Sequence, residues 1–225
     1  MLTLSLALIR STCCVVLVCV GSAMAQNQTT PPRNDTQVWP EVQATMPLNN
    51  RIDLVINGQL RVGRKVGDFV RERGGMGLLI KVHKYFTLSP SYLHIATQPT
   101  PHRKAFENRL GLAATLQFPL GRFTLTDRNL FERRLREPTD SSRYRNRLQI
   151  ARPLKLGGLE LTAYLADEVS YDWTLKGWTR NRLAAGATRR LNRNLTLDLY
   201  YMRQMDGFSR PGNLNVIGSV LRIRL

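Results

Sequence analysis

Apolar and polar side chains alternate with a period of two residues along almost all of the chain, and this pattern restricts the fold more than any other feature. Within residues 106–118 one set of positions is apolar: Phe106, Leu110, Leu112, Ala114, Leu116 and Phe118. The interleaved positions carry Glu107, Arg109, Thr115 and Gln117. Such alternation indicates a strand with one apolar and one polar face. Because no segment keeps a helical period, the sequence predicts an all-β fold.

The same alternation returns within residues 52–57, 159–168 and 195–201, and turn signals separate the expected strands. Tight turns are expected at 47–50, 84–85, 119–121, 156–158 and 192–194, and longer polar stretches near 63–72, 98–104, 137–142, 172–178 and 206–212. The spacing gives about eleven strands, many far longer than the roughly five or six residues usual in soluble proteins. A tilted membrane strand needs about 9–11 residues. We therefore predict a transmembrane antiparallel up-and-down β-barrel of about 10–12 strands.

An odd number of strands is unexpected, because bacterial membrane barrels normally have an even number. Two explanations are open: a further strand within residues 26–38, or a segment among the eleven that lies outside the wall. The second explanation points to residues 36–73, where glycines and charges blur the alternation.

The first 25 residues have the features of a signal peptide. An apolar core around Val15–Val18 is followed by Ala23-Met24-Ala25, the small-x-small pattern of a cleavage site. We therefore expect a signal peptide at 1–25, a flexible polar leader at 26–36 and the barrel at 37–225; a retained membrane anchor is the alternative. All three cysteines lie before residue 26, so the exported chain has no disulfide.

The formal net charge is +17, and removal of Arg10 with the signal peptide leaves +16. A charge this large indicates an anionic partner. Export separates the chain from nucleic acid, so anionic lipid and acidic solutes remain.

Several predicted strands carry arginines on one face, as with Arg143, Arg145 and Arg147. Three arginines facing lipid on one strand would cost roughly 6–12 kcal/mol at the bilayer midplane, so they must face the lumen of a membrane barrel. The predicted basic band of the lumen comprises Arg128, Arg134, Arg145, Arg147, Arg180 and Arg182, with Glu132 and Glu168 as carboxylate partners. Arg133 falls on the opposite face and needs a rim position or a bulge.

Two interpretations of this band are open. The structural one is a ladder of arginine–carboxylate pairs that fills a narrow barrel. The functional one is a basic lumen that concentrates or selects anions. Because arginines exceed nearby carboxylates, some of them are expected to lack partners.

Spaced motifs connect the chain to a known family. They are Thr126–Arg134, Tyr144–Leu148, Asp167–Asp172, Arg180–Leu183 and Leu199–Arg203, with Trp39 near the start and an alternating last strand that ends at Leu225. Together they resemble the bacterial domain of unknown function 2490 family. The resemblance implies an outer-membrane β-barrel, and it does not point to any activity because the family is uncharacterised.

Catalytic, metal and cofactor sites are not expected. Ser89, Ser91 and His94 are close in sequence, but Ser91 and His94 point to opposite sides of a strand. No His or carboxylate cluster has ligand spacing. The aromatic residues fall near predicted strand ends, as an interfacial girdle requires: Trp39, Tyr85, Phe86, Phe118, Phe123, Tyr171, Trp173, Trp178 and Tyr201. Sugar binding by Trp173 and Trp178 is a minor alternative.

The sequence thus favours a non-enzymatic barrel in the outer membrane of a Gram-negative cell, either structural or a narrow anion-biased pore. Its expected partners are outer-membrane lipid, the barrel-insertion machinery during biogenesis, and small anions. The alternatives are an outer-membrane lipid-modifying enzyme and a periplasmic soluble barrel that binds an acidic ligand.

Overall fold

A computed structural model describes residues 33–63, 67–100 and 103–225 and shows an all-β chain. Its eleven strands are β1 (Asn34–Pro47), β2 (Ile52–Gly63), β3 (Asp68–His83), β4 (Phe86–Thr100), β5 (Arg103–Leu120), β6 (Phe123–Arg136), β7 (Ser141–Leu156), β8 (Leu159–Asp172), β9 (Gly177–Arg190), β10 (Leu195–Asp206) and β11 (Asn213–Arg224). The described part of the chain has no helix long and apolar enough to cross a membrane. The expected signal peptide and residues 26–32 of the expected leader lie outside the described residues.

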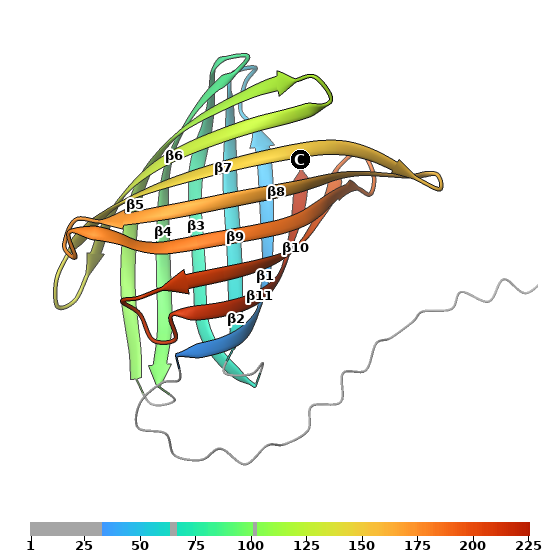
Figure 1. The fold of residues 1–225 in the computed structure, drawn as a ribbon. Helices are drawn as coiled ribbons and strands as arrows, with labels where there is room; N and C mark the ends of the chain where they lie inside the picture. Colours follow the sequence, from blue (N-terminus) through green and yellow to red (C-terminus); the bar gives the residue numbers. More distant parts are fainter. Residues whose placement is uncertain (1–32, 64–66, 101–102) are drawn as a thin grey trace, which may run out of the picture.

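The strands form one closed barrel in which each strand pairs with its neighbours in the sequence. All sequential pairs are antiparallel, as in an up-and-down barrel. In Figure 1 the strands of the near wall slope across those of the far wall, because closing a sheet requires its strands to tilt. The strands contain from 12 to 18 residues, which confirms the length expected from the sequence.

The barrel closes through a parallel pair. β1 pairs with β11 from Asn34↔Asn213 to Thr45↔Arg224. Strand direction alternates around an up-and-down barrel, so with an odd number the first and last strands must run the same way. The odd strand number is therefore real, and it is accommodated by one parallel seam.

The second explanation offered for the odd count is wrong, and residues 26–32 of the first lie outside the described residues. Residues 36–73 form β1, β2 and the start of β3, and all three strands belong to the wall. β1 begins at Asn34, so the barrel starts before residue 37 and overlaps the expected leader.

The two ends of the barrel differ in their connections. We call the end with residues 48–51, 84–85, 121–122, 157–158 and 191–194 the turn end, and the opposite end the loop end. At the turn end Gly157 and Gly158 both have positive φ, which a two-residue hairpin turn requires. The fully described loop-end connections, 137–140, 173–176 and 207–212, are only slightly longer. Part of the stretch expected as a loop at 98–104 is strand, since β4 ends at Thr100 and β5 begins at Arg103.

The two faces of the wall have opposite polarity. Along β5 the outward Leu110 and Leu112 are 52% and 53% exposed, whereas the inward Arg109 is 6% exposed. Exposed apolar side chains continue around the outer wall at Leu148, Leu165, Leu183, Leu199 and Ile217. The alternation read from the sequence thus places most large apolar residues outside and concentrates charged residues inside. A few polar groups also face outward, such as Asp127 with Asn146 at 2.6 Å and Asp167 with Asn181 at 2.7 Å. Arg133 is on the outer face near the loop end, where it pairs with Asp140 at 3.1 Å, in agreement with the rim position.

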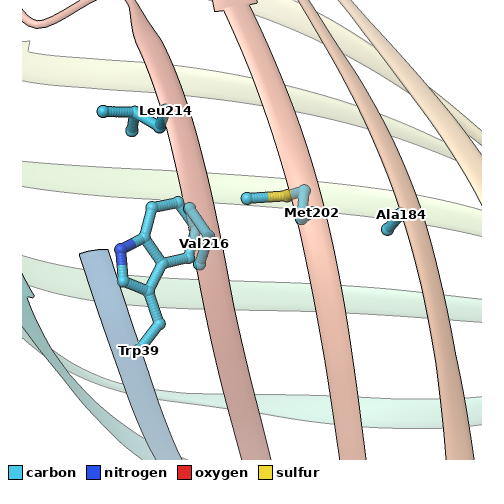
Figure 2. Packing of buried hydrophobic residues seen from close by; sticks show 5 residues of the cluster. All are labelled: Trp39, Ala184, Met202, Leu214 and Val216. Atoms are coloured by element: carbon cyan, nitrogen blue, oxygen red, sulfur yellow. The ribbon is translucent and has the colours of Figure 1, made fainter. Parts of the chain in front are cut away.

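The most buried apolar cluster lies inside the barrel, on the loop-end side of its middle. Trp39 packs there with Ala184, Met202, Leu214 and Val216 (Figure 2). The prediction that Trp39 belongs to an aromatic girdle is therefore wrong. Trp39 is two residues after Gln37 on β1, so both side chains point into the barrel. The side-chain oxygen of Gln37 accepts a hydrogen bond from the indole N–H at 2.8 Å. The outward Tyr171, Trp173 and Trp178 do form an edge-to-face group at the loop end.

The parallel seam can be tested with cysteines, because Val38 pairs with Ile217 and Val42 with Leu221. In the chain from residue 26 onward, which has no native cysteine, oxidation is expected to crosslink Val38→Cys to Ile217→Cys. The matched pair Val38→Cys and Leu221→Cys, four residues out of register, is expected to stay reduced. Crosslinked and open chains are separated on non-reducing gels, and efficient crosslinking of the second pair would contradict the observed register.

Candidate functional site

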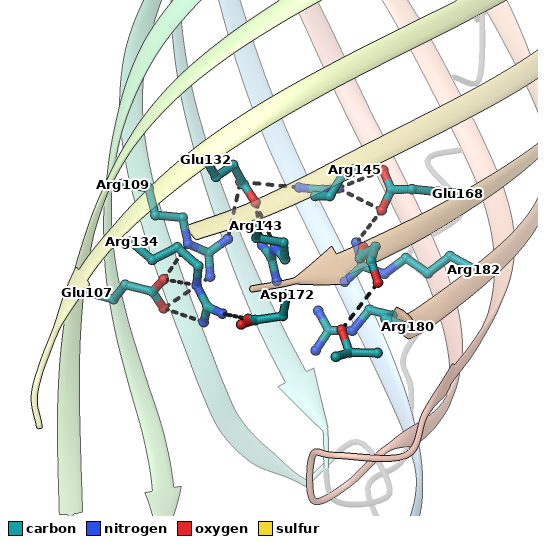
Figure 3. A network of polar contacts seen from close by, with 12 residues as sticks. Glu107, Arg109, Glu132, Arg134, Arg143, Arg145, Glu168, Asp172, Arg180 and Arg182 are labelled. Carbon is teal, nitrogen blue, oxygen red and sulfur yellow. Dashed lines mark hydrogen bonds and ion pairs between the residues drawn. The ribbon is translucent and has the colours of Figure 1, made fainter. Parts of the chain in front are cut away.

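A network of ion pairs fills the loop-end half of the lumen (Figure 3). Glu107 on β5 lies between two guanidinium groups, accepting hydrogen bonds from Arg109 Nε at 2.7 Å and Arg134 Nε at 2.6 Å. Arg134 also contacts Asp172 Oδ2 at 3.2 Å through Nη1. Because these side chains come from β5, β6 and β8, the network ties non-adjacent strands of the wall together.

Glu132 is the centre of this network. It is 2% exposed and accepts two hydrogen bonds from Arg143, at 2.8 and 2.6 Å. Arg145 and Arg109 approach its other oxygen at 3.4 and 3.6 Å. The Glu132 carboxylate thus lies within ion-pair distance of three arginines. Among the described residues of the lumen, Glu107 and Glu168 each pair with only two arginines.

Glu168 extends the network to β9. It contacts Arg145 at 2.7 Å and Arg182 at 3.1 Å. Arg180 on the same strand pairs with Asp206 at 2.6 Å, at the loop end of β10. Charged groups out of water must be paired and hydrogen-bonded to be tolerated, and this network provides that pairing.

The residues predicted from the sequence fall into two groups. Arg134, Arg145, Arg180 and Arg182 belong to the network, as do Glu132 and Glu168. Arg128 and Arg147 line the lumen nearer the turn end and form no ion pair with another described residue.

Sequence reasoning missed several partners in the network: Glu107, Arg109, Asp172 and Asp206. Glu107 and Arg109 share the inward phase of β5, which was a usable signal. Asp172 and Asp206 end their strands and were interpreted as loop residues.

A chamber of about 880 Å³ occupies the middle and turn-end part of the lumen. The network residues Arg134, Arg143, Asp172 and Asp206 lie beyond it and are at most 9% exposed. Inward side chains become more accessible toward the turn end, where Arg222 reaches 38% and Lys81 40%. Among the described residues the network therefore covers the chamber on its loop-end side, and the lumen becomes more accessible toward the turn end.

The wall of the chamber is mixed in polarity. Arg128, Arg145 and Arg147 line the β6–β7 side. On the β8–β11 side Ala166, Ala184, Met202 and Val220 form an apolar stretch, with Glu168 and Arg182 toward the loop end and Asp198 and Arg222 toward the turn end. Two tyrosines lie close against glycines on this side. A Cβ on Gly218 would lie 2.0 Å from Tyr200 Cζ, and one on Gly186 would lie 2.6 Å from the Tyr164 hydroxyl.

Arginines exceed carboxylates in the described lumen. Besides Arg128 and Arg147, Arg61 and Arg71 lack a carboxylate within 4.0 Å among the residues that the structure describes. Arg61 instead stacks on Trp39, with its guanidinium carbon 3.6 Å from the ring centroid. Arg71 donates a hydrogen bond to Thr97 at 3.0 Å. The lumen therefore keeps positive charge that the ion pairs do not neutralise.

The serine and histidine considered for catalysis lie on opposite faces, as predicted. Ser91 lines the chamber, and His94 is exposed on the outer wall, 2.8 Å from Asn108 Oδ1. His102 lies outside the described residues. In the described ranges no group of three or more His, Cys, Asp or Glu side chains is arranged to hold a metal ion. Asp167, which precedes the inward Glu168, is exposed outside and accepts a hydrogen bond from Asn181 at 2.7 Å.

Fold and site together define a closed β-barrel with an apolar outer wall and an ionic interior. The chain belongs to the family described as Protein of unknown function (DUF2490), whose sequence profile matches residues 36–215. The matched region covers most of the wall and every residue of the ion-pair network, which confirms the family indicated by the sequence motifs. A comparison with curated proteins gave no match.

The central role of Glu132 predicts a large effect of Glu132→Gln. Loss of this charge leaves Arg143, Arg145 and Arg109 without their shared partner, so the free energy of unfolding is expected to fall by about 3–5 kcal/mol. Urea titration followed by tryptophan fluorescence measures the change. The control is Glu160→Gln in the exposed pair Lys155–Glu160, which should leave stability unchanged. Equal stability of the two variants would contradict the role of the network.

The contact of Tyr200 with Gly218 predicts that Gly218→Ala is destabilising. The new methyl group must displace the ring, at a cost of about 1–3 kcal/mol. Gly58→Ala is a matched control, because a Cβ there meets nothing within 4 Å. Chemical unfolding curves of the two variants compare the positions directly, and a neutral Gly218→Ala would show that the ring does not cover this glycine.

Proposed function

We propose that the chain is a non-enzymatic outer-membrane β-barrel that accepts small anions into an arginine-lined chamber. In this proposal the chamber is reached from the turn end, and the ion-pair network keeps the loop end closed. The barrel is then an anion-binding membrane protein rather than a permanently open pore.

The polarity of the wall carries the membrane part of the proposal. Large apolar side chains are exposed on the outward face of strand after strand, as with Phe106, Leu165 and Ile217, while buried ions line the interior. An apolar outer band with a polar interior is typical of outer-membrane barrels, and soluble barrels place their apolar face inside. Exposed apolar surface on this scale favours contact with lipid.

The charge of the chamber supports the anion part. Arg128 and Arg147 contribute two cations to its wall that form no ion pair with a described carboxylate, and Arg61 adds a third. A basic, partly enclosed lumen raises the local concentration of anions and selects against cations. The buried network at the loop end supports a closed state, because Arg134 and Arg143 lie in the path that an ion would take.

Reconstitution in planar bilayers tests both parts. The purified chain is expected to insert from detergent and to show no steady conductance. The double variant Glu107→Ala with Glu132→Ala removes two carboxylates that hold the network, and it should open a current selective for chloride over potassium. The control Arg133→Ala with Asp140→Ala breaks an exposed pair outside the lumen and should remain silent.

Three results would contradict the proposal. A chain that is released from cells without detergent is not a membrane barrel. A steadily conducting wild-type chain has no closed loop end. Cation selectivity in the opened variant would exclude a basic lumen.

A further inference from the structure

Two arginines face each other directly across neighbouring strands in the chamber. Arg128 on β6 is the register partner of Arg147 on β7, and both side chains line the cavity. Like charges at directly opposed positions of a sheet destabilise it. The pairing therefore calls for a compensating negative charge.

Among the described residues no carboxylate forms an ion pair with either arginine. Arg147 donates a hydrogen bond to Gln149 Oε1 at 3.1 Å. Its register partner on the other side is Glu168, but this carboxylate is already engaged by Arg145 and Arg182. Arg128 has no carboxylate within 4.0 Å in the described part of the lumen. Two adjacent guanidinium forks suit an oxyanion, because each fork can make two parallel hydrogen bonds to its oxygens.

Beside this pair the wall has an apolar stretch, bordered on its loop-end side by Glu168 and Arg182. Gln149 pairs with Ala166, and Ala166 pairs with Ala184. Val220 also lines the cavity, and Tyr164 and Tyr200 lie close against the wall over glycines. A ligand whose charge sits at Arg128 and Arg147 therefore meets an apolar surface with the rest of its body.

We propose that the chamber binds an amphiphilic organic anion. Its carboxylate or phosphate bridges Arg128 and Arg147, and its alkyl or aromatic body lies against Ala166, Ala184 and Val220. This inference rests on the proposed anion-accepting chamber and adds the class of ligand. The cavity of about 880 Å³ is within the range of roughly 300–1,000 Å³ typical of pockets for organic ligands.

A homologous series of unbranched carboxylates tests whether the alkyl body of the ligand contributes to binding. Acetate, butanoate, hexanoate and octanoate are titrated calorimetrically into the full barrel in detergent, and titration of empty micelles corrects for partitioning. Each buried methylene should tighten binding by about four-fold. Hexylammonium, with the same tail and the opposite charge, should not bind. Comparison of hexyl phosphate with hexanoate shows which head group binds more tightly. Comparison of hexyl phosphate with inorganic phosphate shows the contribution of the tail.

Three variants test which residues of the chamber bind the ligand. Arg128→Gln with Arg147→Gln should weaken every carboxylate by about ten-fold or more, since charge-assisted hydrogen bonds are lost. Ala166→Ser with Ala184→Ser should weaken octanoate and leave acetate unchanged. Arg133→Gln, an arginine on the outer wall, should behave as wild type. Heat-modifiable migration on gels shows that each variant is folded.

The outcomes separate this inference from the proposed function. Equal affinity for acetate and octanoate, with loss of both in the double arginine variant, overturns the amphiphilic ligand and keeps the anion chamber. Binding of hexylammonium as tightly as hexanoate overturns both. A folded double arginine variant that binds hexanoate like wild type excludes Arg128 and Arg147 as the site.

Discussion

The structure depends on the enclosure of ionised side chains by an apolar wall. Glu107, Glu132 and Glu168 each bind two or more arginines in the loop-end half of the lumen. Buried ions are tolerated only when geometry and additional hydrogen bonds compensate their lost hydration. Pairing of β5–β10 brings these groups together, and the Arg134–Asp172 pair joins the non-adjacent strands β6 and β8. Among the described residues the same network covers the loop-end side of the chamber, while the lumen is more accessible toward the turn end.

The parallel seam has a consequence for the interior. With eleven strands β1 and β11 run in the same direction, and β1 brings Trp39 beside Gly218 of β11, where it packs on Val216 and Met202. This cluster covers the β9–β11 side of the lumen, while arginines cover the β6–β7 side. The distribution of apolar and basic residues in the chamber therefore depends on the pairing of the strands as well as on their sequences.

Alternation along single strands predicted much of the fold. It placed Arg145 and Arg147 inside, Leu148 and Leu165 outside, and gave the right number of strands. It could not predict pairing partners, because the stagger between strands decides which carboxylate meets which guanidinium. Asp172 and Asp206 were missed because a strand-end aspartate has the same appearance in sequence as a loop residue. Trp39 was misplaced because an aromatic residue near a strand end suits a girdle and an interior cluster equally well.

The central claim is that successive residues of one strand face opposite environments, lipid outside and an ionic lumen inside. Single cysteines at Arg147, Leu148, Gln149 and Ile150 of β7 test it in lipid vesicles. A fluorophore at Leu148 or Ile150 should be quenched by brominated lipid, whereas one at Arg147 or Gln149 should be quenched only by a water-soluble agent. Uniform quenching of all four positions by the water-soluble agent would contradict the account.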